Sequence, residues 1–168
     1  NSIRNINEFG IYVNDYSIDF SQMINKKNQI VNRLSNGISF LLKKNKIDLY
    51  NGKGKVVSPN LVEVFQEEKK LQISTKNIII ATGSKPVVPP VFNYDGQNVI
   101  TSDEALDLKE QPKSLLIVGA GVIGCEFANI FSILGSKVYM VDTAASILPT
   151  ESKSISQKVE KIFAKRGI

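Results

Sequence analysis

One stretch of the sequence combines the residue types that bind a dinucleotide. The apolar run from Leu115 to Val118 predicts a buried parallel strand, and it leads into the G-x-G-x-x-G turn Gly119-Ala120-Gly121-Val122-Ile123-Gly124. A second apolar run over 137–141 ends at Asp142, which lies 23 residues after Gly119. This is the place of the acid that binds the adenosine ribose in a dinucleotide fold. A glycine-rich structural turn and a solvated acid are the alternatives.

Each glycine of the turn has a mechanical reason. Gly119 permits the sharp turn off the strand, Gly121 removes a Cβ that would keep the backbone from the pyrophosphate, and Gly124 lets the helix pack closely on the strand. The helix N-terminus then offers unpaired N–H groups and a partial positive charge to phosphates. No cation follows Asp142 over 143–146. Because a 2′-phosphate would be repelled by the carboxylate, NAD is favoured over NADP.

Composition excludes several other classes of function. The 168 residues have 42% hydrophobic and 22% charged content, which is typical of a globular protein. The net charge of +5 is scattered through lysine pairs, so we expect solvated faces and no nucleic-acid partner. The longest apolar segment, around Leu115 to Ile123, is too short and glycine-broken to cross a membrane. With one cysteine, Cys125, and no histidine, we expect neither an intramolecular disulfide nor a metal site.

The first half of the chain predicts a helix, a meander and one more strand. Apolar residues at helical spacing follow Asp19 up to Lys44, and we expect their stripe to pack in a core. Short alternating runs over 55–57, 61–65 and 71–73 predict an antiparallel meander, and 77–81 predicts an apolar strand that ends at Thr82-Gly83-Ser84. From spacing alone, that end is either a plain turn or a place where backbone approaches a ligand.

The second half predicts a linker and then the dinucleotide unit. Prolines and a glycine mark a linker between Pro86 and Ile100, and Thr101 to Glu104 has the pattern of a capping box. The last helix is expected over about 152–165. The chain opens on Asn1 rather than Met and ends with Gly167-Ile168, a helix-capping glycine followed by what should be the first residue of a third strand, so we expect an internal piece of a longer protein.

The order of these motifs resembles that of the flavin-dependent pyridine nucleotide–disulfide oxidoreductases, and most closely the members that oxidise dihydrolipoamide. The most specific parts are Ile80-Ala81-Thr82-Gly83-Ser84 and Ser102-Asp103-Glu104-Ala105-Leu106, which both precede the G-x-G-x-x-G turn. The resemblance implies an α/β fold of two incomplete Rossmann-like, doubly wound units and a small antiparallel three-strand meander. Residues 1–90 would be the C-terminal part of an FAD-binding domain, and 91–168 the N-terminal half of an NAD-binding domain.

The resemblance also implies roles for individual residues. The FAD site would include Gly54, Thr82, Gly83 and Ser84. The NAD site would include Gly119, Ala120, Gly121, Val122, Ile123, Gly124, Glu126 and Asp142. Glu126 would lie near the nicotinamide, although a first-turn acid stabilised by the helix dipole is an equal alternative. Asp142 stands where the family more often has glutamate, which is one methylene longer.

By resemblance, the intact enzyme would pass electrons from reduced lipoyl groups through a disulfide and FAD to NAD. Its partner would be the lipoyl domain of a 2-oxoacid dehydrogenase or glycine cleavage complex, and it would be a homodimer in the bacterial cytoplasm, the mitochondrial matrix or a plastid. The family's first G-x-G-x-x-G, its C-x-x-x-x-C pair and its His–Glu base are absent from these 168 residues. We therefore expect no turnover by this chain alone.

Three other functions stay open. Another disulfide reductase of the mercuric or glutathione type is the nearest, although glutathione-type reductases tend to use NADP with arginines after the second strand. A non-catalytic nucleotide-binding module is the second alternative. A basic nucleic-acid binder is the third and the least favoured.

Overall fold

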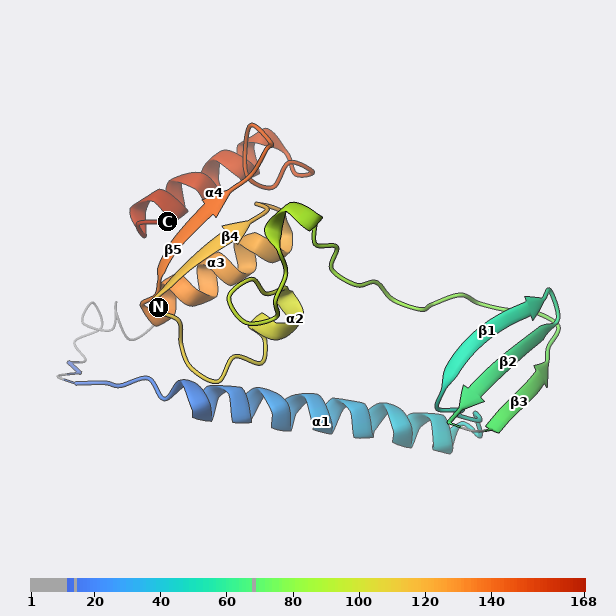
Figure 1. Ribbon diagram of the computed structural model, residues 1–168. Coiled ribbons are helices and arrows are strands. Elements are labelled where there is room, and N and C mark those ends of the chain that lie inside the picture. The colour runs from blue at the N-terminus through green and yellow to red at the C-terminus, as the bar shows by residue number, and fades with distance from the viewer. Residues whose placement is uncertain (1–11, 14, 68) are drawn as a thin grey trace. The chain divides into compact units, whose positions relative to one another are not determined.

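The computed structural model describes residues 12–13, 15–67 and 69–168. Their contacts divide the chain into two compact units. One unit joins Pro90–Ile168 with the beginning of the chain up to Asn25, and the other is Lys26–Pro89. The units contain an antiparallel three-stranded sheet and a parallel two-stranded sheet (Figure 1), which confirms the α/β class and the small meander.

The long predicted helix forms as α1, Phe20–Lys44. Asp19 caps its N-terminus, because the amide of Gln22 donates to Asp19 Oδ1 at 2.8 Å. Two lysines in its last turn suit the helix dipole. The expected burial of its apolar stripe is wrong, since no residue of α1 is buried and Leu34 is 64% exposed. An apolar stripe on a helix is buried only where it packs against a hydrophobic core. Among the described residues, Phe20 is the one residue of α1 that packs against the core cluster.

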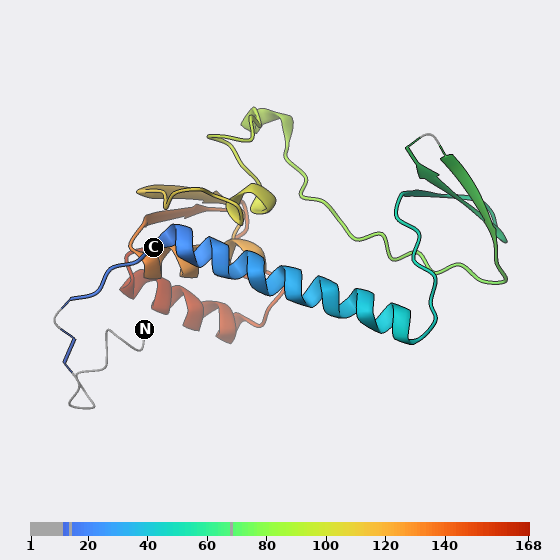
Figure 2. The ribbon, with the colours of Figure 1, turned by 90° about the horizontal axis from the view of Figure 1, so that it is seen from below.

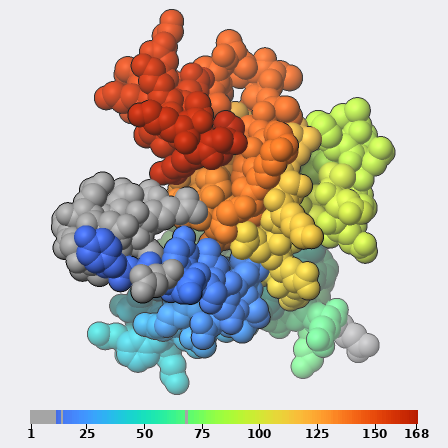
Figure 3. Space-filling model, turned by 90° about the vertical axis from the view of Figure 1, so that its left-hand side faces the viewer, coloured from blue at the N-terminus to red at the C-terminus, as the bar shows by residue number. Residues whose placement is uncertain are grey.

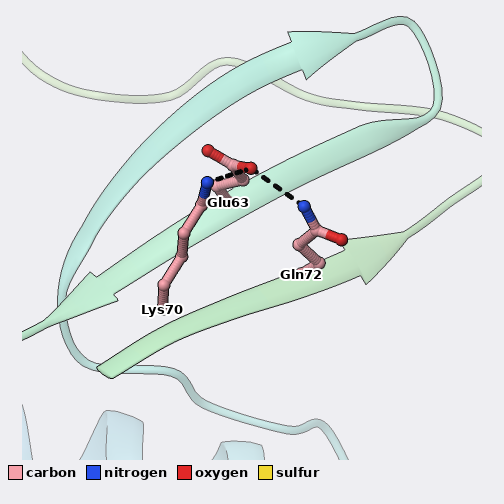
Figure 4. A network of polar contacts seen from close by, with 3 residues as sticks. All are labelled: Glu63, Lys70 and Gln72. Carbon is pink, nitrogen blue, oxygen red and sulfur yellow. Dashed lines mark hydrogen bonds and ion pairs between the residues drawn. The ribbon is translucent and has the colours of Figure 1, made fainter.

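The three short runs form the predicted meander in the order β1-β2-β3 (Figure 1). These strands are β1 Lys53–Ser58, β2 Leu61–Gln66 and β3 Lys69–Ser74. At the centre of β2 the carboxylate of Glu63 is paired with Lys70 at 2.7 Å and accepts from Gln72 Nε2 at 3.0 Å (Figure 4). Glu63 is only 7% exposed, and these contacts lower the pKa of its carboxyl, with the bond to Lys70 as the larger cause. A buried charge is tolerated when it is paired in this way.

The expected strand over 77–81 is not formed. This segment is irregular, and Ile79 is 91% exposed. A strand is held by hydrogen bonds to a neighbouring strand, and no described strand pairs with it. An apolar sequence run therefore does not suffice to make a strand here.

Two short helical elements form in the linker and directly after it. A 3₁₀ turn, η2, covers Pro90–Phe92, and α2 covers Ser102–Ala105. The predicted capping box is present, because the side chain of Thr101 accepts from the amide of Asp103 and the Glu104 carboxylate accepts from the amide of Thr101.

The remaining elements form a β-α-β-α unit. They are β4 Ser114–Val118, α3 Val122–Leu134, β5 Lys137–Val141 and α4 Lys153–Lys165. β4 and β5 pair in parallel, from Ser114 opposite Lys137 to Val118 opposite Val141. Figure 2 shows α3 and α4 on the same face of this sheet, and Figure 3 shows the C-terminal residues, in red, packed against the orange residues that precede them.

The core of this unit lies between the parallel sheet and the two helices. Its buried centre consists of Cys125, Ala128, Phe131, Val138, Leu148 and Phe163. The strands alternate as a sheet covered on one face should, because Ile117 and Val138 point to this core whereas Val118 and Tyr139 are about half exposed. The core therefore fixes the end of β4 against the start of α3, which is where the glycine turn lies.

Candidate functional site

The turn after β4 needs a glycine at its first position. Gly119 has φ +108°, a left-handed conformation that side chains disfavour, and its amide donates to the carbonyl oxygen of Val141 at 2.9 Å. This bond continues the ladder between β4 and β5 by one residue. The glycine therefore lets the chain leave the sheet immediately beyond the last paired residue.

Gly124 needs to be glycine for a different reason. A Cβ at this position would lie 2.0 Å from the carbonyl oxygen of Gly119 and 3.3 Å from Cγ2 of Ile117. The first turn of α3 thus rests directly on the backbone of the glycine turn. This is the close contact between helix and strand that the sequence predicted for the third glycine.

Gly121 has the opposite surroundings. It caps α3 with φ −72°, and a Cβ placed on it would meet nothing within 4 Å. Among the residues that the structure describes, then, no steric reason requires a glycine there. The open space suits the close approach of a ligand to the backbone, as the fingerprint predicts.

The start of α3 offers three amides to that space. The first intrahelical bond of α3 runs from the amide of Cys125 to the carbonyl of Gly121, and the amides of Gly121, Val122 and Ile123 have no hydrogen-bond partner among the described residues. All three residues are exposed. Unpaired amides at the positive end of a helix dipole form a cradle for an anion such as a pyrophosphate.

Asp142 lies beside the turn, at the end of β5. Its Oδ2 accepts from the amide of Ala120 at 2.6 Å, and its Oδ1 accepts from the amide of Ala144 at 2.7 Å. These two bonds, the one to Ala120 first, lower the pKa of the Asp142 carboxyl. The carboxylate is exposed and charged at neutral pH, so it retains acceptor capacity for ribose hydroxyls.

Ala120 is held on its other side as well. Its carbonyl oxygen accepts from the amide of Leu148 at 2.8 Å and from Cys125 Sγ at 3.5 Å, and the residue is 2% exposed. Gly119 and Ala120 therefore use their amides inside the protein. Of the sequence-predicted NAD residues, Gly121, Val122 and Ile123 are the ones that present amides to the outside.

Cys125 and Glu126 differ in their surroundings. Cys125 is buried, and burial raises the pKa of its thiol, so the helix end does not activate it. Glu126 is exposed, but it lies beyond the first turn of α3, which contains no acid. The alternative of a first-turn acid is therefore wrong, because α3 begins at Val122.

The residues expected at FAD belong to the unit Lys26–Pro89. Gly54 lies in β1 opposite Val64, and no atom would lie within 4 Å of a Cβ on it. Thr82, Gly83 and Ser84 lie in the exposed irregular segment after the meander, where Gly83 has φ +73° and the same open surroundings. The structure thus brings Gly119–Gly124 and Asp142 together within one unit, whereas these four residues belong to the other.

Two residues that support the site, Leu148 and Ser156, were not found from the sequence. Leu148, with φ +50°, donates to the turn, and its own carbonyl oxygen accepts from the buried Oγ of Ser156 at 3.2 Å. A left-handed leucine has no sequence signal, since this conformation favours glycine or asparagine. The sequence signal nearest to these two residues was Ser152, which predicted the start of the helix that contains Ser156.

The comparisons with known proteins cover almost the entire sequence. The family model described as pyridine nucleotide-disulphide oxidoreductase matches residues 3–168. A dihydrolipoyl dehydrogenase of Acholeplasma laidlawii is 42% identical over 100% of this chain and 50% of its own length. A dihydrolipoyl dehydrogenase of Bacillus subtilis is 38% identical over 98% of this chain and 37% of its own length. The chain thus spans between about a third and a half of these relatives.

The chain is also similar to parts of solved structures. The HOCl-induced flavoprotein disulfide reductase RclA from Escherichia coli superposes with a TM-score of 0.79 at 34% identity, over 89% of this chain and 34% of that one. LpdA from Mycobacterium tuberculosis superposes with a TM-score of 0.89 over 99% of this chain and 37% of that one, and at 23% identity it shows the fold alone. None of the described helices has the length and apolar character that crossing a bilayer requires. From the family match over residues 3–168, the chain belongs to the pyridine nucleotide-disulphide oxidoreductase family.

Proposed function

We propose that this chain is the part of a dihydrolipoyl dehydrogenase that binds NAD and contributes to the FAD site. The observation that carries the proposal is the cradle at the start of α3, where three exposed amides face the open space beside Gly121. The relatives named dihydrolipoyl dehydrogenase, up to 42% identical over the chain, support the specific activity. In this proposal residues 1–90 complete the FAD-binding domain and 91–168 open the NAD-binding domain.

The residues of the cradle fit a dinucleotide. The amides of Gly121, Val122 and Ile123 would donate to the pyrophosphate, and Gly124 would keep α3 seated on the turn. Asp142 would accept from the adenosine ribose hydroxyls. Glu126, on the exposed side of α3, would lie near the nicotinamide.

NAD is proposed over NADP on electrostatic grounds. The Asp142 carboxylate is held ionised by two amides, and a 2′-phosphate beside it would bring two negative charges together. Residues 143–146 supply no cation to offset them. An NADP site needs such a cation.

For the flavin, we propose that Gly54, Thr82, Gly83 and Ser84 contribute to its site. The open surroundings of Gly54 and Gly83 support a close approach of backbone to a ligand. When bound, FAD would supply the electron transfer between a disulfide and the nicotinamide, and the chain's part is to bind and orient the cofactors. The partner of the intact enzyme would be a lipoyl domain, and the enzyme would be a homodimer.

A second candidate activity comes from one comparison. RclA is a flavoprotein disulfide reductase at 34% identity, so another disulfide substrate is the alternative to dihydrolipoamide. The NAD cradle is common to both proposals. Steady-state assays of the intact protein with dihydrolipoamide and with other thiols would separate them.

Gly121→Val tests the cradle directly. The valine side chain would occupy the space that the pyrophosphate needs, whereas the backbone at φ −72° accepts a side chain and no protein atom lies within 4 Å of the new Cβ. We expect NADH binding in a fluorescence titration to be lost while the thermal unfolding midpoint stays the same. Unchanged NADH affinity in the folded variant would refute the proposal.

A further inference from the structure

Asp142 connects two loops rather than standing alone at the end of β5. One oxygen accepts from Ala120 in the glycine turn, and the other accepts from Ala144 in the segment that follows the strand. At 2.6 and 2.7 Å these are short, charge-assisted bonds, which are stronger than bonds between neutral groups. The carboxylate therefore joins the two loops that follow the C-terminal ends of β4 and β5.

The segment 142–148 holds Ala120 from both sides. Asp142 at its beginning binds the amide of Ala120, and Leu148 at its end donates to the carbonyl oxygen of the same residue. Leu148 is in turn anchored to α4, because its carbonyl oxygen accepts from the buried Oγ of Ser156. Both polar backbone groups of one turn residue are thus bound by a single segment.

This arrangement decides which amides remain for a ligand. Ala120 lies between Gly119, whose amide belongs to the sheet ladder, and Gly121, whose amide is the first that faces outward. If Ala120 lost its contact with Asp142, its amide would turn toward another acceptor and the direction of the following amide planes would change with it. The orientation of all three cradle amides therefore depends on the bond from Ala120 to Asp142.

We propose that Asp142 is a positioning residue for the pyrophosphate as well as the acceptor for the adenosine ribose. By holding Ala120, it sets the amides of Gly121, Val122 and Ile123 in place before a nucleotide arrives. The inference rests on the proposed NAD site and goes beyond it, since an acid that served the ribose alone would leave phosphate binding unaffected.

Two nucleotides that differ only in the ribose hydroxyls separate these roles. ADP carries a diphosphate and the 2′,3′-diol, whereas 2′,3′-dideoxy-ADP carries the diphosphate without the diol. The full chain and its Asp142→Asn variant would be titrated with each by NMR. The asparagine keeps one acceptor oxygen, so it can accept from only one of the two backbone amides, and faster solvent exchange of the Ala120 amide in the variant identifies the bond to Ala120 as the one lost. Ser146→Ala is the matched control, because Ser146 is an exposed residue of the same segment.

We expect the unsubstituted chain to bind ADP more tightly than dideoxy-ADP. Asp142→Asn should weaken both, and the affinity for dideoxy-ADP should fall about three- to tenfold, which corresponds to the loss of one hydrogen bond. Ser146→Ala should change neither. If Asp142→Asn speeds the exchange of the Ala120 amide and weakens ADP but leaves dideoxy-ADP unchanged, the positioning role is wrong and the ribose role stands. An unsubstituted chain that binds neither nucleotide would overturn the nucleotide site itself.

A second measurement, of amide hydrogen exchange, uses the unsubstituted chain and therefore does not depend on whether a variant folds. In the ligand-free chain, the amide of Ala120 should exchange with solvent at least about tenfold more slowly than that of Gly121, since only the first is hydrogen-bonded. Equal exchange rates would show that Asp142 does not hold Ala120 in solution, and the inference would fail.

Discussion

The hydroxyl of Tyr94 donates a 2.7 Å hydrogen bond to Oε1 of Glu104, whose other oxygen accepts from the amide and the hydroxyl of Thr101. A linker residue is thus attached to the capping box of α2. The bonds from Tyr94 and Thr101 lower the pKa of Glu104 from 4.5 to about 2, and the same contact raises the pKa of Tyr94. The Glu104 carboxylate of the capping box is therefore fully ionised over the whole physiological pH range.

The first prediction is a pH dependence of this capping box. Because the pKa of Glu104 is lower in the folded chain than its ordinary value of 4.5, its contribution to stability is complete above pH 4.5 and is lost as the pH falls toward 2. A carboxyl ¹³C titration should place the Glu104 pKa near 2. Tyr94→Phe should raise that pKa, whereas Tyr12→Phe, at an exposed tyrosine, should not. An ordinary Glu104 pKa in the unsubstituted chain would contradict the prediction.

The second prediction concerns Gly37 and Gly124, the two glycines that lie in helices among the described residues. Gly124→Ala should destabilise the chain by roughly 1–3 kcal/mol, because the new Cβ would lie 2.0 Å from the Gly119 carbonyl oxygen and α3 would have to move. Gly37→Ala in α1 is the matched control, since a Cβ there meets nothing within 4 Å. It should be neutral or stabilising by up to about 1 kcal/mol. Urea unfolding of both variants checks the prediction, and equal stabilities would refute the role of Gly124.

The sequence predicted the local structure of the dinucleotide unit well because its signals are local. The conformation of Gly119, the contact at Gly124 and the capping of α1 by Asp19 each follow from a few neighbouring residues. The apolar run over 77–81 failed as a strand because a strand depends on a partner that is distant in the sequence. The burial of the α1 stripe failed for the same reason.

Within the site, the sequence identified the residues but missed how they are connected. It placed Asp142 as a ribose acceptor, and nothing in the spacing showed that its oxygens bind Ala120 and Ala144. The contact from Leu148 comes from a residue with a left-handed backbone, whose carbonyl oxygen accepts from Ser156 of α4. The contacts of Asp142 and Leu148 with Ala120 join segments more than 20 residues apart, so no local pattern encodes them.

The third prediction is a change in cofactor preference. In the intact protein, Asp142→Arg should weaken NAD and improve NADP, because the guanidinium can pair with the 2′-phosphate while the ribose loses its charged acceptor. Loss of a hydrogen bond to a charged group costs roughly 1.5–3 kcal/mol, so the NAD affinity should fall by at least about tenfold. Steady-state titrations with both cofactors measure the effect. An equal loss for both would show that Asp142 acts only through the turn.

The last prediction concerns the 168-residue chain by itself. It contains one cysteine, Cys125, and no histidine, so it has neither a dithiol pair nor an imidazole base. Cys125 is buried with a raised thiol pKa, and it is therefore a poor nucleophile. We expect the purified chain to show no lipoamide-dependent NADH oxidation, even with FAD added, although the cradle is locally complete and should bind NADH weakly.

The assay follows NADH absorbance with and without lipoamide, and Gly121→Val serves as the control for nucleotide binding. FAD should not co-purify in equal amount with the chain, because Gly83 and its neighbours lie in an exposed segment that no described strand holds. A yellow, fully flavinylated chain with measurable turnover would contradict the prediction. It would require a redox centre other than a cysteine pair, since Cys125 has no second thiol in this sequence with which to form a disulfide.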